Sequence, residues 1–398
     1  MYSKRIFIIA FAGILFYSCG RKTAGSNVET ISINPHEAAE YVNLSEIADS
    51  IKCIKLQSDP DDIMGRVLEI IIKKKYIYAW DASQKIIFVF DKEGKLVSKL
   101  DKKGQGPGEY LHISNFFVDD NEEYIEIRSF TNMLKYKNIS FEWIASSPFP
   151  DVNCNMIIRN ANLYYCATQQ LDNSINGEKT NAELVIVDDK NNVKTLFDKN
   201  IETNHHYFAI NGGCFTKNDK NEIFMSLMYG NTFYRLEAGT ASPVFAVDFG
   251  KYSLNNNTGF ESTETQMKYI KEINGLAFFP LLNMNNENVM SFSYYFKSDN
   301  NIRWPNETDF RQYIKFKKKN KVYHVKQIKN DLSDFPSHAY IGSDLFGCIH
   351  EVWYEDYLVD IVLPDQYISD GREKIFVEGL GEIRADDDPI VVLMKLKK

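Results

Sequence analysis

Several patterns that identify well-known chemistries are missing from this chain of 398 residues. It contains no G-x-S-x-G, no H-E-x-x-H and no P-loop, which mark hydrolase nucleophiles, zinc proteases and nucleotide-binding loops. It also contains no C-x-x-C, so neither a structural zinc site nor a redox motif of that kind is indicated. We therefore assign no catalytic residue, no metal ligand and no cofactor from the sequence.

Cysteine is too scattered to form a disulfide framework. Apart from Cys19 there are five cysteines, an odd number with wide spacing, whereas disulfide-rich domains carry an even number. Cys154 and Cys166 flank one predicted hairpin and could pair in an exported protein; buried free thiols are the simpler interpretation. Both alternatives stay open at this point. The five are Cys53, Cys154, Cys166, Cys214 and Cys348.

An excess of basic residues is missing as well. The chain has 46 Lys and Arg against 54 Asp and Glu; without residues 1–18, which hold two basic residues and no acid, the balance is 44 against 54, a net charge of −10. Proteins that bind nucleic acid rely on Lys and Arg to neutralise phosphate, so we predict no nucleic-acid partner. The basic run KFKKKNK (315–321) is interpreted as a solvated strand edge and turn.

The apolar run near the N-terminus is too short to span a bilayer comfortably. It covers residues 6–17, follows Lys4 and Arg5, and ends in LFYSCG. This predicts a signal peptide (1–18) with a loose lipoprotein cleavage box, lipidation of Cys19 and a tether over 19–35; an ordinary secretory peptide is the alternative. Because no acidic cluster follows Cys19, we expect an outer-membrane lipoprotein that faces the periplasm, with surface display as the alternative.

Short apolar segments recur along the chain with turn residues between them. Residues 66–72, 76–81, 85–91 and 95–100 predict four strands of an antiparallel meander. Similar sets of four begin near residues 113, 154 and 208, a period of roughly 40–55 residues that is typical of a β-propeller.

The rhythm breaks after residue 250. Residues 261–275 predict a helix, because apolar residues recur there at helical spacing and Gly275 follows as a stop signal. We place an insertion at about 251–287. Strands resume at 288–297, 309–317 and 321–328, and the last set uses 346–354, 374–379 and 386–398. The prediction is an all-β protein: one propeller domain over 36–398, with six four-stranded antiparallel blades closed into a ring and a short helical insertion.

The stretch GQGPGEY (104–110) suggests a phosphate loop only superficially. A dinucleotide loop needs G-x-G-x-x-G opening a helix, whereas Pro107 breaks that spacing and a strand-like segment follows. We interpret the stretch as a structural loop from the outer strand of blade one to the inner strand of blade two. Gly104, Gly106 and Gly108 allow the tight path, and Pro107 fixes one φ angle.

The segment FVFDKEGKLVSKLDKKGQGPGEYLHISNFFVDD resembles the six-bladed β-propeller lipoproteins common in Bacteroides-type bacteria. The cleavage box, LSEIADSIKCIKLQSD (44–59) and the closing DDDPIVVLMKLKK are also similar to that family. Leu100, Asp101 and Gln57 depart from its usual residues without affecting the predicted fold. The family has no well-established catalytic activity, so the resemblance implies a shape and a cellular address rather than a chemistry.

Connections from an outer strand to the next inner strand lie on one face of a propeller, near the mouth of the central channel, and this face is the default binding site. Histidines and carboxylates there could bind a metal or perform acid–base chemistry, but loops are rich in polar residues in any case. The paired carboxylates Asp119–Asp120 and Asp188–Asp189 are interpreted as turn caps. The binding candidates are Glu109, Tyr110, His112, Asp151, Asn153, His205, His206, Tyr207, Asp334 and His338.

The leading functional hypothesis is a non-catalytic binding or scaffold module for a glycan, a peptide or a protein partner, in contact with the membrane through its lipid anchor alone. The alternative is a propeller lyase or hydrolase that acts on glycans at the channel face. Convergence of His112, His205, His206 and His338 with an acid would favour the enzyme. A third hypothesis is a structural role, in which the helix at 261–275 docks on a membrane complex.

Overall fold

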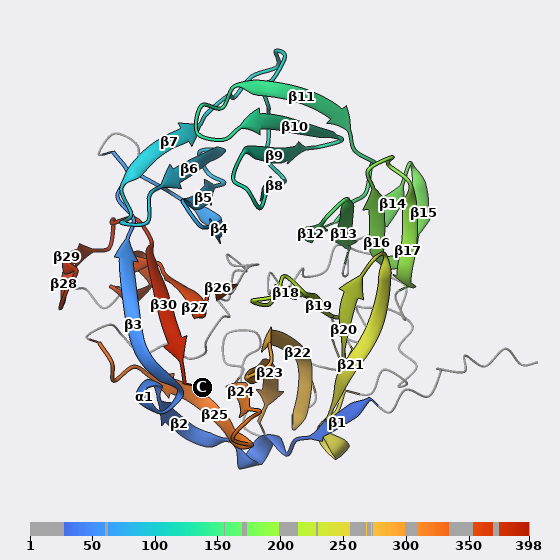
Figure 1. The fold of residues 1–398 in the computed structure, drawn as a ribbon. Helices are drawn as coiled ribbons and strands as arrows, with labels where there is room; N and C mark the ends of the chain where they lie inside the picture. The colour runs from blue at the N-terminus through green and yellow to red at the C-terminus, as the bar shows by residue number, and fades with distance from the viewer. Residues whose placement is uncertain are drawn as a thin grey trace, which may run out of the picture.

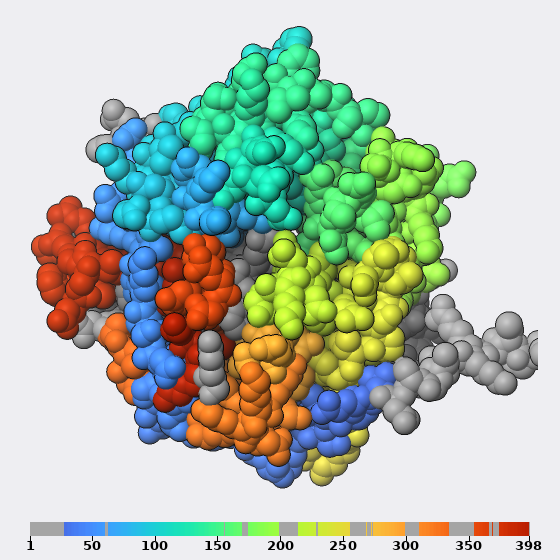
Figure 2. Space-filling model, viewed as in Figure 1, coloured from blue at the N-terminus to red at the C-terminus, as the bar shows by residue number. Residues whose placement is uncertain are grey.

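The computed structural model describes residues 28–59, 63–154, 156–168, 173–198, 214–227, 230–254, 268, 272, 274–298, 309–333, 353–368 and 374–397. These residues form six sheets of four antiparallel strands arranged in a ring (Figure 1). The prediction of a six-bladed β-propeller is confirmed. Figure 2 shows the blades packed side by side around the ring.

Blades one and two follow the sequence prediction strand by strand, and their strands pair in chain order from the centre of the ring outward. Every residue of the two middle strands of blade one is buried, because neighbouring blades cover both faces, which explains their uninterrupted apolar sequence. The strands are β4 (Val67–Ile72), β5 (Ile77–Asp81), β6 (Ile86–Phe90), β7 (Leu96–Leu100), β8 (Asn115–Val118), β9 (Tyr124–Ser129), β10 (Asn132–Lys137) and β11 (Trp143–Pro148).

Blades three to five repeat the pattern with additions. Blade three carries an extra hairpin, and blades four and five each gain an outer fifth strand from the N-terminal segment, paired in parallel. The strands of blade three are β12 (Met156–Asn160), β13 (Leu163–Ala167), β16 (Ala182–Asp188) and β17 (Val193–Asp198), with the hairpin β14 (Asn173–Ile175) and β15 (Glu178–Thr180). Blade four has β18 (Phe215–Lys217), β19 (Ile223–Ser226), β20 (Thr232–Glu237), β21 (Thr240–Asp248) and β1 (Glu29–Ser32). Blade five has β22 (Leu276–Asn285), β23 (Val289–Lys297), β24 (Asp309–Phe316), β25 (Lys321–Lys329) and β2 (Ala39–Asn43).

Blade six joins the two ends of the chain and closes the ring (Figure 1). Its outermost strand comes from the N-terminal part, and it pairs with the C-terminal strand in antiparallel register from Ala48↔Leu396 to Lys55↔Ile390. Just beyond this strand, the Gln57 N–H donates to Gly94 O of blade one at 2.8 Å. The strands are β26 (Trp353–Tyr354), β27 (Tyr357–Val362), β30 (Ile390–Leu396) and β3 (Ala48–Lys55), with the side hairpin β28 (Lys374–Val377) and β29 (Gly381–Arg384).

Short helical turns connect some of these strands. They are η1 (Pro35–Glu37), α1 (Leu44–Ile47), η2 (Gly250–Tyr252) and α3 (Pro364–Tyr367). None of the helices in the described ranges is both long and apolar enough to cross a membrane.

Apolar side chains between adjacent sheets hold the blades together. Tyr78 and Ile87 of blade one pack in one cluster with Phe116 and Ile125 of blade two, and all four are buried. A second cluster joins blades five, six and one. Because a blade buries these faces only against its neighbours, the ring is stable only when closed.

Two predicted boundaries need correction. The tether was predicted to extend to residue 35, but β1 already pairs with β21, so the folded unit begins at β1. The insertion predicted at about 251–287 overlaps β22, which is the innermost strand of blade five. This strand is irregular: Phe279 has φ +52°, and the register with β23 shifts between Phe278 and Leu281. Of the helix predicted at 261–275, positions 268, 272, 274 and 275 are described; 268 and 272 are helical, whereas 274 and 275 form a bend.

Candidate functional site

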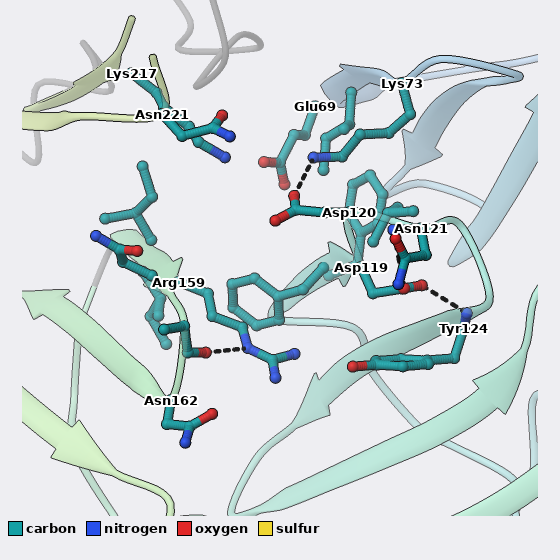
Figure 3. A pocket seen from close by; sticks show the side chains of 18 residues that line it. Glu69, Lys73, Asp119, Asp120, Asn121, Tyr124, Arg159, Asn162, Lys217 and Asn221 are labelled. Carbon is teal, nitrogen blue, oxygen red and sulfur yellow. Dashed lines mark hydrogen bonds and ion pairs between the residues drawn. The ribbon is translucent and has the colours of Figure 1, made fainter.

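A cavity of about 350 Å³ lies where the innermost strands of blades one to four end. β4, β8, β12 and β18, with the turns that follow them, supply its walls. Lys217 and Asn221 lie across the opening from Lys73 and Asp120 (Figure 3). The polar lining consists of Glu69, Lys73, Asp119, Asp120, Asn121, Tyr124, Arg159, Asn160, Asn162, Lys217 and Asn221.

Charged groups at this pocket have partners within the protein. Lys73 Nζ lies 3.7 Å from the Asp120 carboxylate, whose side chain is 80% exposed. Arg159 forms an ion pair with Glu126 and donates from Nε to Ala161 O at 3.1 Å. Burial and the Glu126 carboxylate raise the pKa of the neighbouring Tyr164 to about 12, so that phenol stays neutral. The pocket is thus polar but electrostatically balanced.

Asp119 shapes the turn that forms one side of the pocket. Its carboxylate accepts hydrogen bonds from the backbone N–H groups of Asn121, Glu123 and Tyr124 at 3.1, 2.7 and 2.7 Å. Asp188 does the same for Lys190 and Asn192 at the turn between β16 and β17, the two outer strands of blade three. The interpretation of these two residues as turn caps is confirmed, and Asp119 is therefore a structural part of the pocket wall.

This pocket lies at the opposite end of the inner strands from the predicted binding face. The predicted candidates Glu109, Tyr110 and His112 precede β8, whereas Asp119 and Asp120 follow it. The sequence signal for this pocket is a cluster of Asn and Asp after the inner strands β8, β12 and β18, and it is indistinguishable from ordinary turn chemistry.

Tyr110 and Glu109 both make hydrogen bonds within the GQGPGEY loop, but Tyr110 alone of the two is buried. The Tyr110 hydroxyl lies 2.9 Å from the carbonyl oxygens of both Lys85 and Leu100, and the residue is 1% exposed. Burial raises the pKa of this phenol, which keeps its proton for those carbonyls. The Glu109 carboxylate accepts from the Gly106 N–H at 2.8 Å. The assignment of Tyr110 as a binding residue is corrected to a structural role, whereas Glu109 remains exposed; the structural interpretation of the loop is supported.

Gly108 provides a test of this loop. It has φ +72°, and a Cβ atom there would lie 2.5 Å from Trp143 Cγ. We expect Gly108→Ala to lower the free energy of unfolding by about 2 kcal/mol, because it adds a steric clash to the cost of a left-handed backbone. Gly177→Ala is the matched control, since Gly177 has φ +84° and no atom within 4 Å of the added Cβ. Urea unfolding measures both; equal losses would contradict a specific contact with Trp143.

The three other described candidates, His112, Asp151 and Asn153, lie on the surface. His112 is exposed and its ring lies 5.7 Å from that of Phe130; partial burial, then the Lys85 charge, lower the pKa of this imidazole. Asp151 and Asn153 are exposed on the segment between β11 and β12. Within the described ranges, no three His, Cys, Asp or Glu side chains are grouped to hold a metal. Cys19, His205, His206, Tyr207, Asp334 and His338 lie outside the described residues, so the histidine criterion for the enzyme alternative stays untested.

Comparisons with known proteins place the chain in a structural context. A family model described as "Domain of unknown function (DUF4934)" matches residues 28–395. A crystal structure of a protein from Bacteroides fragilis, described as exported, matches with a TM-score of 0.65 and 15% identity, over 93% of this chain and 100% of that one. A member of the duf4221 family from Bacteroides vulgatus matches with a TM-score of 0.51 and 10% identity, over 88% and 97%. No curated protein matches significantly. The resemblance to a Bacteroides-type propeller family is confirmed.

Proposed function

Since the chain belongs to the DUF4934 family, we propose that it is an exported, lipid-anchored propeller that acts as a non-catalytic binding or scaffold module in the periplasm. The observation that carries this proposal is the polar pocket at the ends of β4, β8, β12 and β18. Pockets of this size, formed by several elements of a rigid scaffold, are typical ligand sites.

The chemistry of the lining favours a hydroxyl-rich ligand such as a segment of a glycan. Four asparagines, at 121, 160, 162 and 221, contribute to the lining. Each amide both donates and accepts hydrogen bonds, as sugar hydroxyls do. Phe117 and Tyr124 add aromatic surface, on which a sugar ring can pack. A peptide or a protein loop, with its alternating N–H and C=O groups, is the competing ligand class.

The same lining argues against catalysis at this site. An acid–base pair needs groups that can exchange protons with a substrate. Asp119 is occupied by three backbone N–H groups, Arg159 by Glu126, and Lys73 faces Asp120. These groups position the turns and leave a balanced surface for recognition.

The direction of β1 supports an orientation at the membrane. β20 ends and β21 begins on the side of the pocket, and β1 runs parallel to β21. The chain therefore approaches the propeller from the pocket side. With lipid on Cys19, eight residues lie between the anchor and Val28, and the nine steps from Cys19 to Val28 span at most about 30 Å. The pocket would then open on the side of the protein that is nearer the membrane.

Thermal unfolding with added ligands tests the binding role. A ligand that binds only the folded protein at about 100 times its Kd adds about 2.7 kcal/mol of stability and raises Tm. We expect a neutral oligosaccharide in a panel of oligosaccharides and short peptides to raise the Tm of the full-length protein. If no probe of either kind raises Tm, the proposed ligand classes are wrong.

Paired variants locate the site. We expect the double variant Lys73→Gln and Asp120→Asn to bind the ligand that raised Tm at least about tenfold more weakly, because an altered polar contact costs about 1.4 kcal/mol or more. Asp151→Asn, at the opposite channel mouth, is the matched control and should leave binding unchanged. Isothermal titration measures both. Loss of binding in the Asp151 variant alone would move the site to the originally predicted face.

A further inference from the structure

Two thiols and one guanidinium lie together where blade two joins blade three. Cys154 belongs to the segment between β11 and β12, and Cys166 lies in β13. Both are free thiols, and Cys154 packs against the apolar cluster that contains Cys166. Nη1 of Arg128, a residue of β9, lies 3.2 Å from Cys154 Sγ. None of these three residues lines the pocket.

Arg128 is held firmly in this position. Its Nη2 donates to Val152 O at 2.8 Å and its Nε donates to Phe130 O at 3.1 Å. The ring of Phe149 covers the guanidinium at 5.0 Å, and Arg128 is only 6% exposed. A fixed positive charge therefore stands beside one sulfur atom in a site with little water, where it favours the thiolate.

The environment gives the two thiols different chemistry. The hydrogen bond from Cys166, aided by the charge of Arg128, lowers the pKa of Cys154 to about 7 against the effect of burial. Burial raises the pKa of Cys166 well above the ordinary value. By contrast, burial raises the pKa of Cys53 to about 11. Cys154 is thus suited to attack an oxidant first, and Cys166 to react afterwards with the oxidised Cys154.

We infer that Cys154 and Cys166 form a dithiol site that is oxidised to an intramolecular disulfide by a disulfide-bearing oxidant, protein or small molecule, in the cell envelope. Exported proteins meet such oxidants, whereas cytosolic thiols are kept reduced. The bond joins the segment that carries Asp151 and Asn153 to the second strand of blade three. Closing this loop stabilises the junction of blades two and three.

The reaction balances with the oxidant as electron acceptor. The Cys154 thiolate attacks one sulfur of the oxidant's disulfide, forms a mixed disulfide and releases the other sulfur as a thiolate. Cys166 then loses its proton to solvent and attacks Cys154 Sγ, which expels the oxidant's second thiolate. The protein loses two hydrogens in total, and the oxidant gains two electrons and two protons.

Thiol trapping on the full-length, exported protein tests the inference. Cells are quenched with acid, free thiols are alkylated, and peptides are mapped by mass spectrometry. We expect a peptide pair linked through Cys154 and Cys166, about 2 Da lighter than the sum of its reduced peptides, with Cys53 and Cys214 alkylated. If both thiols stay alkylated in the exported protein and after incubation of the purified protein with excess oxidised glutathione, the inference is overturned.

Single substitutions test the order of attack. With oxidised glutathione, Cys166→Ser should retain glutathione on Cys154, because the resolving thiol is missing. Cys154→Ser should leave Cys166 unmodified, because burial keeps it protonated. Glutathione on Cys166 in the absence of Cys154 would overturn the assigned roles. Peptide mapping of the unsubstituted protein remains decisive if either variant fails to fold.

Discussion

A chain that stops after Pro389 is expected not to fold. This truncation removes β30, which pairs with β27 on one side and with β3 on the other. Six of its seven residues are buried, and at about 1.5–3 kcal/mol for each side chain their loss amounts to about 10 kcal/mol. That is comparable with the whole stability of a typical domain, about 5–15 kcal/mol. Soluble yield, circular dichroism and gel filtration measure the result.

The opposite terminus supplies the control. Removing residues 28–33 deletes β1, which is a fifth strand on the outer edge of blade four and lies outside the closing blade. We expect this variant to fold with a lower Tm, because the four antiparallel strands of that blade remain paired. If the truncation after Pro389 gives a cooperative thermal transition like that of the control, closure through blade six is not what holds the ring.

The strand repeat could be predicted because residues close together in the sequence determine each strand and turn. In blade one, KEG before Lys95 and apolar runs such as IIFVF define turns and strands within a few residues of each other. The pairing that closes the ring could not be predicted in this way, because β3 and β30 come from opposite ends of the chain. The segment IKCIKL does not indicate by itself which strand it pairs with. β22 was not predicted for a local reason, since it is buried on both faces and its sequence shows no regular alternation of apolar and polar residues.

The candidate pocket could not be predicted because residues from four blades come together to form it. Asp119 behaves as a turn cap in its own blade, and its neighbour Asp120 becomes part of a pocket only because Lys73, Arg159 and Asn221 arrive from three other blades. Tyr110 shows the converse error. A tyrosine in a glycine-rich loop suggested an exposed ligand contact, but the loop folds back so that the ring enters the core. Long-range packing decides whether a residue of a loop or turn faces a cavity or the core.

A large loss of stability is also expected for Asp81→Asn. Asp81 is the last residue of β5, and its carboxylate accepts several hydrogen bonds. One oxygen accepts from the Gly65 N–H at 2.5 Å and from Gln84 Nε2 at 3.1 Å. The other oxygen accepts from the backbone N–H and the hydroxyl of Ser83 at 2.8 and 2.6 Å. The carboxylate thereby ties the segment that precedes β4 to the turn after β5. An asparagine amide would place a donor against other donors in a fully buried position, at a cost of about 3–4 kcal/mol. Asp91→Asn is the matched control. The Asp91 carboxylate accepts from the Glu93 and Lys95 N–H groups at an exposed turn, and a loss of about 1 kcal/mol is expected.

The pH dependence distinguishes a buried carboxylate from a packing defect. Burial by itself would raise the pKa of Asp81, but the hydrogen bonds from Ser83, Gln84 and Gly65 outweigh it and hold the pKa below its ordinary value of 3.8. A carboxyl whose pKa is lower in the folded state stabilises the fold fully above the unfolded pKa, and this contribution fades as the pH falls through the folded pKa. The difference in unfolding free energy between the native protein and Asp81→Asn should therefore be largest at pH 7 and shrink below about pH 4. Urea unfolding at several pH values measures it, and a difference that stays constant down to pH 2.5 would mean that the charge of Asp81 contributes nothing.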